Sequence, residues 1–115
     1  MKVQNMTSSK GNMVANQFII YTEFGSVFQS YKSIIAKIVD YKDGLYNPTI
    51  ELDQKYRNYS NTTGKYRNIF LNETIKDTKK KIKSGEYKLV DLNINNKIHY
   101  HDKLDENGIT INGGI

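Results

Sequence analysis

Residues 59–85 constrain the fold more than any other part of the chain, because they read as a helix with a start signal and a stop signal. The stretch begins with Asn61, Thr62 and Thr63, whose short side-chain oxygens suit the free N–H groups of a first turn. It ends at Ser84-Gly85, where glycine tolerates the left-handed backbone of a helix C-terminus. These signals predict one long helix over about residues 62–84.

The apolar residues of this stretch fall on two faces of the predicted helix. At about 100° per residue, Leu71, Ile75 and Ile82 share one face. Tyr66 and Phe70 form a second stripe roughly a third of a turn away. We expect the helix to pack by these faces, so that a proline at Ile75 would break it and unfold the domain.

The first half of the chain is typical of a β-sheet, because its apolar runs are rich in β-branched and aromatic residues. A glycine-containing turn at residues 23–26 predicts a hairpin. Residues 31–39 fit a helical and a strand pattern alike, and their Ile and Val residues favour the strand. The predicted strands cover residues 14–22, 27–31, 31–39, 49–52 and, at a sheet edge, 85–92.

These elements predict an α+β fold in which a small antiparallel sheet packs against the long helix. At 115 residues the chain has the length of one domain. We expect a flexible N-terminus over residues 1–13, the domain over residues 14–92, and a loose tail over residues 93–115. The tail is rich in Asn, Asp and Gly, so its deletion is expected to leave stability nearly unchanged.

Composition and terminal sequence bear on location. No apolar run approaches the roughly 18 residues of a membrane span. The first residues lack the apolar core of a secretory signal. The chain has no cysteine, which excludes disulfides and thiolate chemistry. We therefore expect a cytoplasmic protein.

The net charge of +5 is concentrated in the middle of the chain. Residues 1–54 balance to zero. Residues 55–88 hold ten Lys or Arg against three Asp or Glu, and residues 89–115 hold two against four. A basic helix face is a footprint for phosphate or for an acidic partner, although a solvated surface has the same composition.

Nine residues of the basic stretch are candidates for contact with a partner or with nucleic acid. Aromatic and cationic side chains alternate around the predicted helix start, as backbone contact combined with base stacking requires. Interface hot spots of proteins have the same composition, and Tyr66 also fits the core. The candidates are Arg57, Tyr59, Lys65, Tyr66, Arg67, Lys79, Lys80, Lys81 and Lys83.

No pattern indicates catalysis or a cofactor. The segment Thr62-Thr63-Gly64-Lys65 lacks the glycine spacing of a phosphate-binding loop, and capping explains its composition better. His99 and His101 are two residues apart, but no second ligand pair exists, so we predict no metal site. The carboxylates show no spacing that selects a pair. We expect a protein that is not an enzyme and binds no cofactor.

Several segments, in order, resemble a widespread group of short proteins from tailed phages and prophages. The segments are residues 9–12, 15–18, 28–37, with Ser30-Tyr31-x-Ser33-x-Ile35-Ala36, and 59–71, with Tyr59-Ser60-x-Thr62-Thr63-x-Lys65-Tyr66. The tryptophan that usually precedes the Tyr-Ser pair is absent, and Tyr56 or Arg57 stands near its place. The group has no assigned function. The resemblance implies a phage context and a strand at the Ile-Ala segment.

Size, charge and this context lead to the functional expectation. We expect a binding protein that inhibits a host defence or nucleic-acid-processing complex, in the manner of an anti-CRISPR protein, in the host cytoplasm. Its basic helix would occupy an acidic or RNA-facing surface of a host protein or nucleoprotein complex, without a membrane. The alternatives are an accessory protein that binds RNA or DNA directly and a structural accessory protein of the virion.

Overall fold

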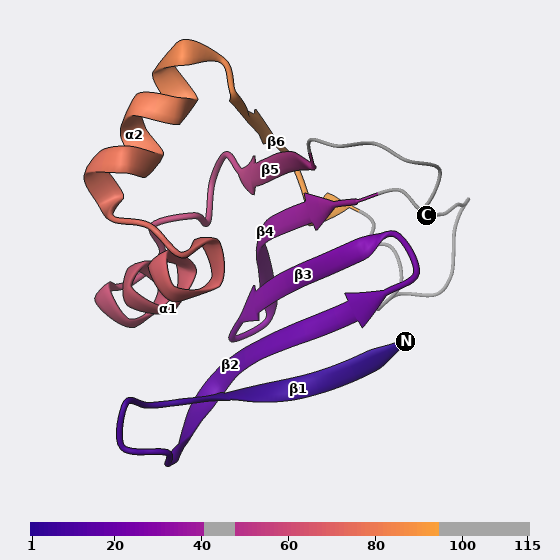
Figure 1. Ribbon diagram of the computed structural model, residues 1–115, viewed down its shortest axis with the longest axis vertical. Helices are drawn as coiled ribbons and strands as arrows, with labels where there is room; N and C mark the ends of the chain where they lie inside the picture. The colour runs from indigo at the N-terminus through magenta and orange to yellow at the C-terminus, as the bar shows by residue number, and fades with distance from the viewer. Residues whose placement is uncertain (41–47, 95–115) are drawn as a thin grey trace.

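A computed structural model describes residues 1–40 and 48–94 of the chain (Figure 1). Its strands form one sheet in which spatial order follows sequence order. Neighbouring strands are antiparallel, except that the last one pairs in parallel with the strand before it. The strands are β1 (Lys2–Thr7), β2 (Met13–Thr22), β3 (Gly25–Ser30), β4 (Ser33–Val39), β5 (Thr49–Asp53) and β6 (Tyr87–Val90).

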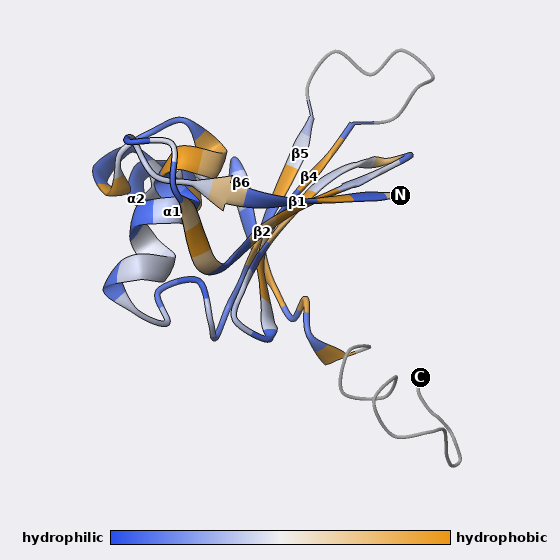
Figure 2. Ribbon diagram, turned by 90° about the horizontal axis from the view of Figure 1, so that it is seen from below, coloured by the Kyte–Doolittle hydropathy of each residue, from blue (hydrophilic) through white to orange (hydrophobic). Residues whose placement is uncertain are grey.

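Two helices, α1 (Asn61–Leu71) and α2 (Ile75–Ser84), make the crossover from β5 to β6. A parallel pair of strands needs such a connection, because the chain must return to the same end of the sheet. Both helices lie on one side of the sheet (Figure 2). The α+β class and the mostly antiparallel sheet are therefore confirmed.

The single long helix over residues 62–84 is wrong, because the chain turns between α1 and α2. Asn72 adopts the left-handed conformation, with φ 57° and ψ 51°, and ends α1. Thr74 then starts α2 through a capping box: its side chain accepts from the Asp77 N–H, and the Asp77 carboxylate accepts from the Thr74 N–H. Ile75 is consequently the first residue of a helix and not an interior one.

The outer ends of the helical region lie close to where the sequence predicts them. The N-cap of α1 is Ser60, one residue before the predicted group, and its Oγ accepts from the Thr63 N–H at 3.1 Å. Gly85 ends α2 with φ 85°, as predicted. The C-terminal cap was thus predicted at the right residue and the N-terminal cap one residue too late, and the break in the middle was not predicted.

The predicted strands are confirmed, including the strand over the ambiguous residues 31–39, which form β4 from Ser33 onward. The hairpin between β2 and β3 closes at Gly25, which has φ 147°. A Cβ atom on Gly25 would lie 1.9 Å from the carbonyl oxygen of Ile38, so the neighbouring strand leaves no room for a side chain.

Residues 2–7 form β1, where the sequence predicts a flexible N-terminus. The strand pairs with β2 through a register shift at Asn5/Thr7 and buries Met6 in the core. The composition of β1 gives no strand signal, because Met6 is the only buried residue in this strand and its neighbours are mostly polar or exposed. β1 therefore forms because it pairs with the long β2, and not because its own residues favour a strand.

Asn93, the first residue after the predicted domain boundary at residue 92, contacts the sheet. The Asn93 side chain is buried: its Oδ1 accepts from the Ile34 N–H at 2.7 Å, and its Nδ2 donates to the Ile34 carbonyl and to Asp53. Asn93 therefore ties the end of the domain to β4 and β5. Residues 95–115 of the predicted tail, with His99 and His101, lie outside the described residues.

The core lies between the sheet and the helices. Phe28 of β3 stacks on Phe70 of α1 with ring centroids 5.8 Å apart. The Ser30 and Thr63 hydroxyls hydrogen-bond at 2.8 Å beneath α1. The buried apolar cluster comprises Met6, Phe28, Ile35, Ala36, Leu52, Tyr66 and Tyr87.

No helix in the described part of the chain is long and apolar enough to cross a membrane.

Candidate anion-binding groove

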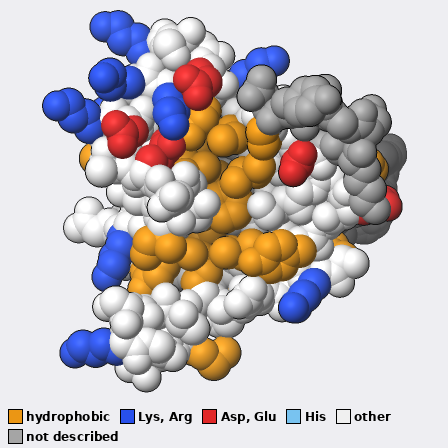
Figure 3. All heavy atoms as spheres, viewed as in Figure 1, with side chains coloured by type: hydrophobic (Ala, Val, Ile, Leu, Met, Phe, Trp, Pro, Cys, Tyr) orange, Lys and Arg blue, Asp and Glu red, His pale blue; other side chains and the backbone are white. Residues whose placement is uncertain are grey.

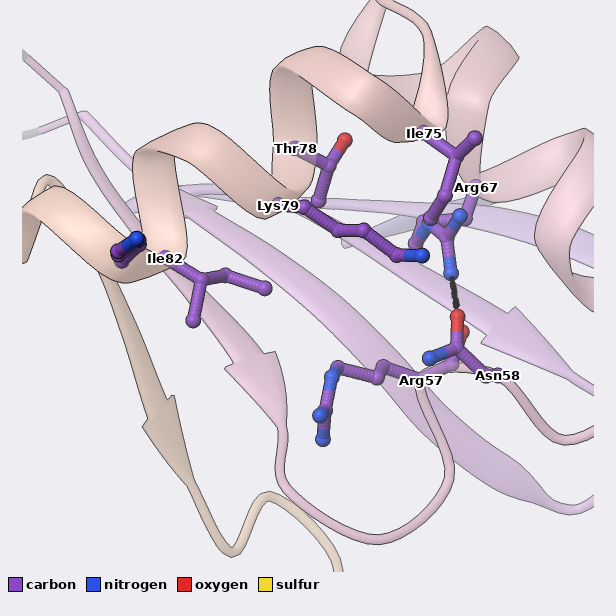
Figure 4. A pocket seen from close by; sticks show the side chains of 8 residues that line it. Arg57, Asn58, Arg67, Ile75, Thr78, Lys79 and Ile82 are labelled. Atoms are coloured by element: carbon purple, nitrogen blue, oxygen red, sulfur yellow. Dashed lines mark hydrogen bonds between the residues drawn. The ribbon is translucent and has the colours of Figure 1, made fainter.

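A cavity of about 180 Å³ opens between α2 and the segment that leads from β5 into α1 (Figure 4). Four of its lining side chains are cations, and none is a carboxylate. Converging positive charges in a hollow surface attract anions more strongly than the same charges spread over a flat one. The lining residues are Arg57, Asn58, Arg67, Ile75, Thr78, Lys79, Ile82 and Lys83.

Arg67 is the fixed cation of this cavity. It is only 2% exposed, and its guanidinium donates to the Arg57 carbonyl at 2.7 Å, to Asn58 Oδ1 and to Asn68 Oδ1. All three acceptors are neutral, and its buried Nε has no hydrogen-bond partner among the described residues. Burial lowers the pKa of Arg67, the Arg57 charge lowers it further, and the charge of Glu73 acts in the opposite direction. An anion in the cavity would compensate a charge that is costly to bury alone.

Arg57 and Lys79 approach the cavity from different elements. Figure 4 shows Lys79 extending from α2 toward Arg67, while Arg57 comes from the segment before α1 with its guanidinium turned away from Arg67. Arg57 Nη1 donates to the Gln54 carbonyl at 2.5 Å, which limits its freedom. Lys83 follows Lys79 by one helical turn and lies on the same side of α2. The crossover connection therefore brings together cations that are up to 26 positions apart in sequence, from 57 to 83.

A buried carboxylate holds the segment that carries Arg57. Asp53 is at the end of β5, and its Oδ2 accepts from the N–H groups of Lys55 and Tyr56 at 3.0 and 2.7 Å. Its Oδ1 accepts from the Leu92 N–H at 2.8 Å and from the Asn93 side chain at 2.9 Å. Asp53 thus fixes the turn out of β5 and the turn after β6 with one side chain.

A second, shallower hollow of about 410 Å³ continues the cavity along the start of α1. Asn58, Arg67 and Ile75 line both, so the two hollows adjoin at these residues. Tyr59 and Lys65 line only the second hollow. We call the two hollows together the cationic groove: Arg57, Lys79 and Lys83 line its first hollow, and Tyr59 and Lys65 line its second.

The structure divides the nine sequence candidates into three groups. Six of them, Arg57, Tyr59, Lys65, Arg67, Lys79 and Lys83, line the groove. Tyr66 is buried in the core, as its alternative reading had it. Lys80 and Lys81 line a separate hollow on another side of α2, with Asp77, Ser84 and Glu86. The run Lys79-Lys80-Lys81 is therefore no single patch, because successive residues of a helix point about 100° apart.

Lys81 is part of a structural network centred on Glu73, in the turn between the helices. Glu73 Oε1 accepts from Lys81 Nζ at 2.9 Å and from the Tyr87 hydroxyl at 2.6 Å, and Oε2 accepts from the Thr78 hydroxyl at 2.5 Å. Burial acts to raise the pKa of Glu73, but these hydrogen bonds together outweigh it and lower the pKa. Burial, aided by the bond to Glu73, raises the pKa of Tyr87 to about 12. The network joins α2 to β6, and within it Lys81 is paired with Glu73.

Sequence reasoning missed the neutral lining of the groove. Asn58 and Thr78 carry no charge signal, and Ile75 was assigned to a helix interior. The pattern Thr74-x-x-Asp77 is a capping-box signal that would have placed the start of α2, and with it the groove. Asp53 also was not predicted: two of its partners, Lys55 and Tyr56, are close in sequence, but Leu92 and Asn93 lie about 40 residues along the chain.

The described lining of the groove is cationic, polar and apolar, and it contains no His, Asp, Glu or Cys. Within residues 1–40 and 48–94, no three His, Cys, Asp or Glu side chains gather as metal ligands would. Hydroxyl, amide and cationic groups remain, and these are the usual donors to phosphate and carboxylate.

Fold and site together define a small α+β protein with a cationic groove over a helical crossover. Residues 1–88 match a family of unknown function, DUF8033, and the chain belongs to this family. The matched residues include every described lining residue of the groove. No curated protein and no solved structure gives a significant match.

Proposed function

We propose that this protein is a non-catalytic binding protein that holds phosphate groups of a nucleic acid in the cationic groove. The observation that carries the proposal is the convergence of Arg57, Arg67, Lys79 and Lys83 on one cavity whose described lining has no acid. Guanidinium groups suit phosphate, because their planar fork can donate two parallel hydrogen bonds. Arg67 is already held in place, so little side-chain freedom is lost when an anion binds.

The length of the groove favours a chain of phosphates over a single small anion. The second hollow adds Lys65 to the site and shares Asn58 and Arg67 with the first. Figure 3 shows several Lys and Arg side chains over α2 at one end of the molecule, with acidic side chains among them. The excess of cations in residues 55–88 would also speed the approach of a polyanion. Direct nucleic-acid binding therefore becomes the leading candidate function.

Inhibition of a host defence or nucleic-acid-processing complex remains the second candidate. The exposed Tyr59 beside Arg57 favours it, since Tyr and Arg are enriched in protein interface hot spots. A phage context would supply the biological reason. Capture of a host protein that survives nuclease treatment of the lysate supports this candidate, whereas capture of nucleic acid alone supports the first.

The direct test compares two double variants of α2 that change charge equally. Lys79→Glu with Lys83→Glu alters the groove, whereas Lys76→Glu with Lys80→Glu alters exposed positions outside its lining. Binding of labelled DNA and RNA oligonucleotides is measured by fluorescence anisotropy. We expect the groove variant to bind much more weakly than the wild type and the control to keep most of the wild-type affinity. Equal losses would mean that net charge alone acts, and the proposal would be wrong.

A further inference from the structure

Three tyrosines form an aromatic cluster beside the cationic groove. Tyr59 stands in the middle, with its ring centroid 5.8 Å from that of Tyr31 and 6.2 Å from that of Tyr56. Both contacts are edge-to-face, at 62° and 65°, an arrangement that aromatic pairs favour. Tyr59 is nevertheless 61% exposed and Tyr31 40%. The cluster therefore exposes the Tyr59 and Tyr31 rings to solvent, while contacts with its neighbours hold the Tyr59 ring in place.

The backbone at Tyr31 has a conformation that is unusual for a bulky residue. Tyr31 is in the turn between β3 and β4 and has φ 56°, a left-handed conformation that a bulky residue rarely adopts. Its N–H donates to the Asn16 carbonyl at 2.7 Å, and its carbonyl accepts from Gln29 Nε2 at 2.9 Å. Glycine would fit this turn with less strain. Strained residues of this kind occur often at binding sites.

Cations surround the aromatic surface. Lys55 Nζ lies 5.3 Å from the centroid of the Tyr56 ring. Tyr59 itself lines the groove together with Lys65, and Arg67 lies at the junction of the two hollows. A strand whose phosphates follow the groove would therefore pass directly beside the exposed Tyr59 ring.

We propose that this cluster is a base-stacking platform, and that the ligand of the groove is a single-stranded nucleic acid. A base would stack on Tyr59, supported by Tyr31, while the phosphates lie in the cationic groove. This inference rests on the proposed function. Single strands offer their base faces to aromatic side chains, whereas a duplex keeps these faces stacked on one another. DNA and RNA share this chemistry.

The test uses the full chain with oligo-dT, oligo-U and a DNA duplex of equal length. Tyr59→Ala should weaken binding of the single strands by roughly tenfold or more, and Tyr59→Phe should keep it, because the ring remains. Tyr31→Gly should weaken it too, while suiting the turn. Tyr21→Ala is the control, since Tyr21 is an exposed tyrosine outside the groove. Stronger binding of oligo-U than of oligo-dT, or the reverse, identifies the natural source.

The outcomes separate this inference from the proposed function. If Tyr59→Ala binds single strands as wild type does, or if the duplex binds as tightly as they do, the platform is wrong. The proposal that the groove binds phosphates is then still supported, provided that Lys79→Glu with Lys83→Glu weakens binding more than the control variant does. If the wild type binds no oligonucleotide, both proposals fail together.

Discussion

Buried polar residues hold the functional segments of this protein in place. Asp53 fixes the turn before Arg57, Glu73 joins α2 to β6, and Arg67 links α1 to the segment before it. A buried polar group that loses its partner costs more than the contact itself contributes, because its desolvation is no longer compensated. Substitutions at these residues should therefore act on stability first and on binding second.

Glu73→Gln is expected to lower the free energy of unfolding by about 1–3 kcal/mol at neutral pH, since hydrogen bonds to a charged group are lost. The pKa of Glu73 is lowered in the folded state, so its contribution is present above the ordinary value of 4.5 and is lost as pH falls through the folded pKa. Urea titrations between pH 7 and pH 3 measure the effect. A difference from wild type that stays constant below pH 4.5 would contradict this account, and Glu86→Gln, at an exposed residue, is the control.

Two glycines should respond to alanine in opposite ways. Gly64 lies inside α1, where a Cβ atom would meet only Arg67 Nη2 at 3.8 Å, so Gly64→Ala should stabilise the protein by about 0.5–1 kcal/mol. Gly25→Ala should destabilise it, because its Cβ would clash with the backbone of Ile38. Thermal melting of both variants checks the pair. A lower melting temperature for Gly64→Ala would show that the start of α1 does not have this geometry.

At the scale of elements, the break between α1 and α2 reverses the expectation for Ile75. Proline is tolerated at the first position of a helix, where the N–H has no intrahelical partner. Thr74 before it is extended, with φ −88° and ψ 164°, as a residue preceding proline must be. Ile75→Pro should therefore fold, whereas Lys80→Pro, at an exposed interior position, should cost about 3 kcal/mol or more. If Ile75→Pro lost the circular dichroism spectrum of the folded protein, that result would support the single long helix predicted from the sequence.

The elements that the sequence predicted are those with local signals. β4 was predicted from its β-branched residues. The ends of the helical region were predicted from capping residues, next to Ser60 at the start and at Gly85 at the end. The strand β1 and the turn at Asn72 were missed for different reasons. β1 depends on pairing with a distant strand, and a left-handed Asn is a weaker stop signal than glycine. The groove was predicted in part, because its cations lie in one basic stretch, but only the crossover shows which of them converge.

At the scale of the whole molecule, the last described residues close the domain. Asn93 bonds to β4 and β5, so a chain ending after Leu92 loses these contacts while one ending after Ile94 keeps them. The shorter chain should be less stable by about 1–3 kcal/mol. Chemical unfolding of both chains measures the difference. Equal stability of the two chains would support a domain boundary at residue 92. Asn93→Ala in the full chain should reproduce the loss of stability.

The central claim is that the cationic groove holds phosphates, and the salt dependence of binding tests it most directly. Each phosphate contact on a single strand contributes a slope of about −0.7 to log affinity against log salt. The slope of Lys79→Glu with Lys83→Glu should be flatter than that of the wild type by roughly 1.4, if each lysine makes one contact. The slope of Lys76→Glu with Lys80→Glu should stay near wild type. A wild-type affinity that does not change with salt, or equal slopes for the two variants, would contradict the account.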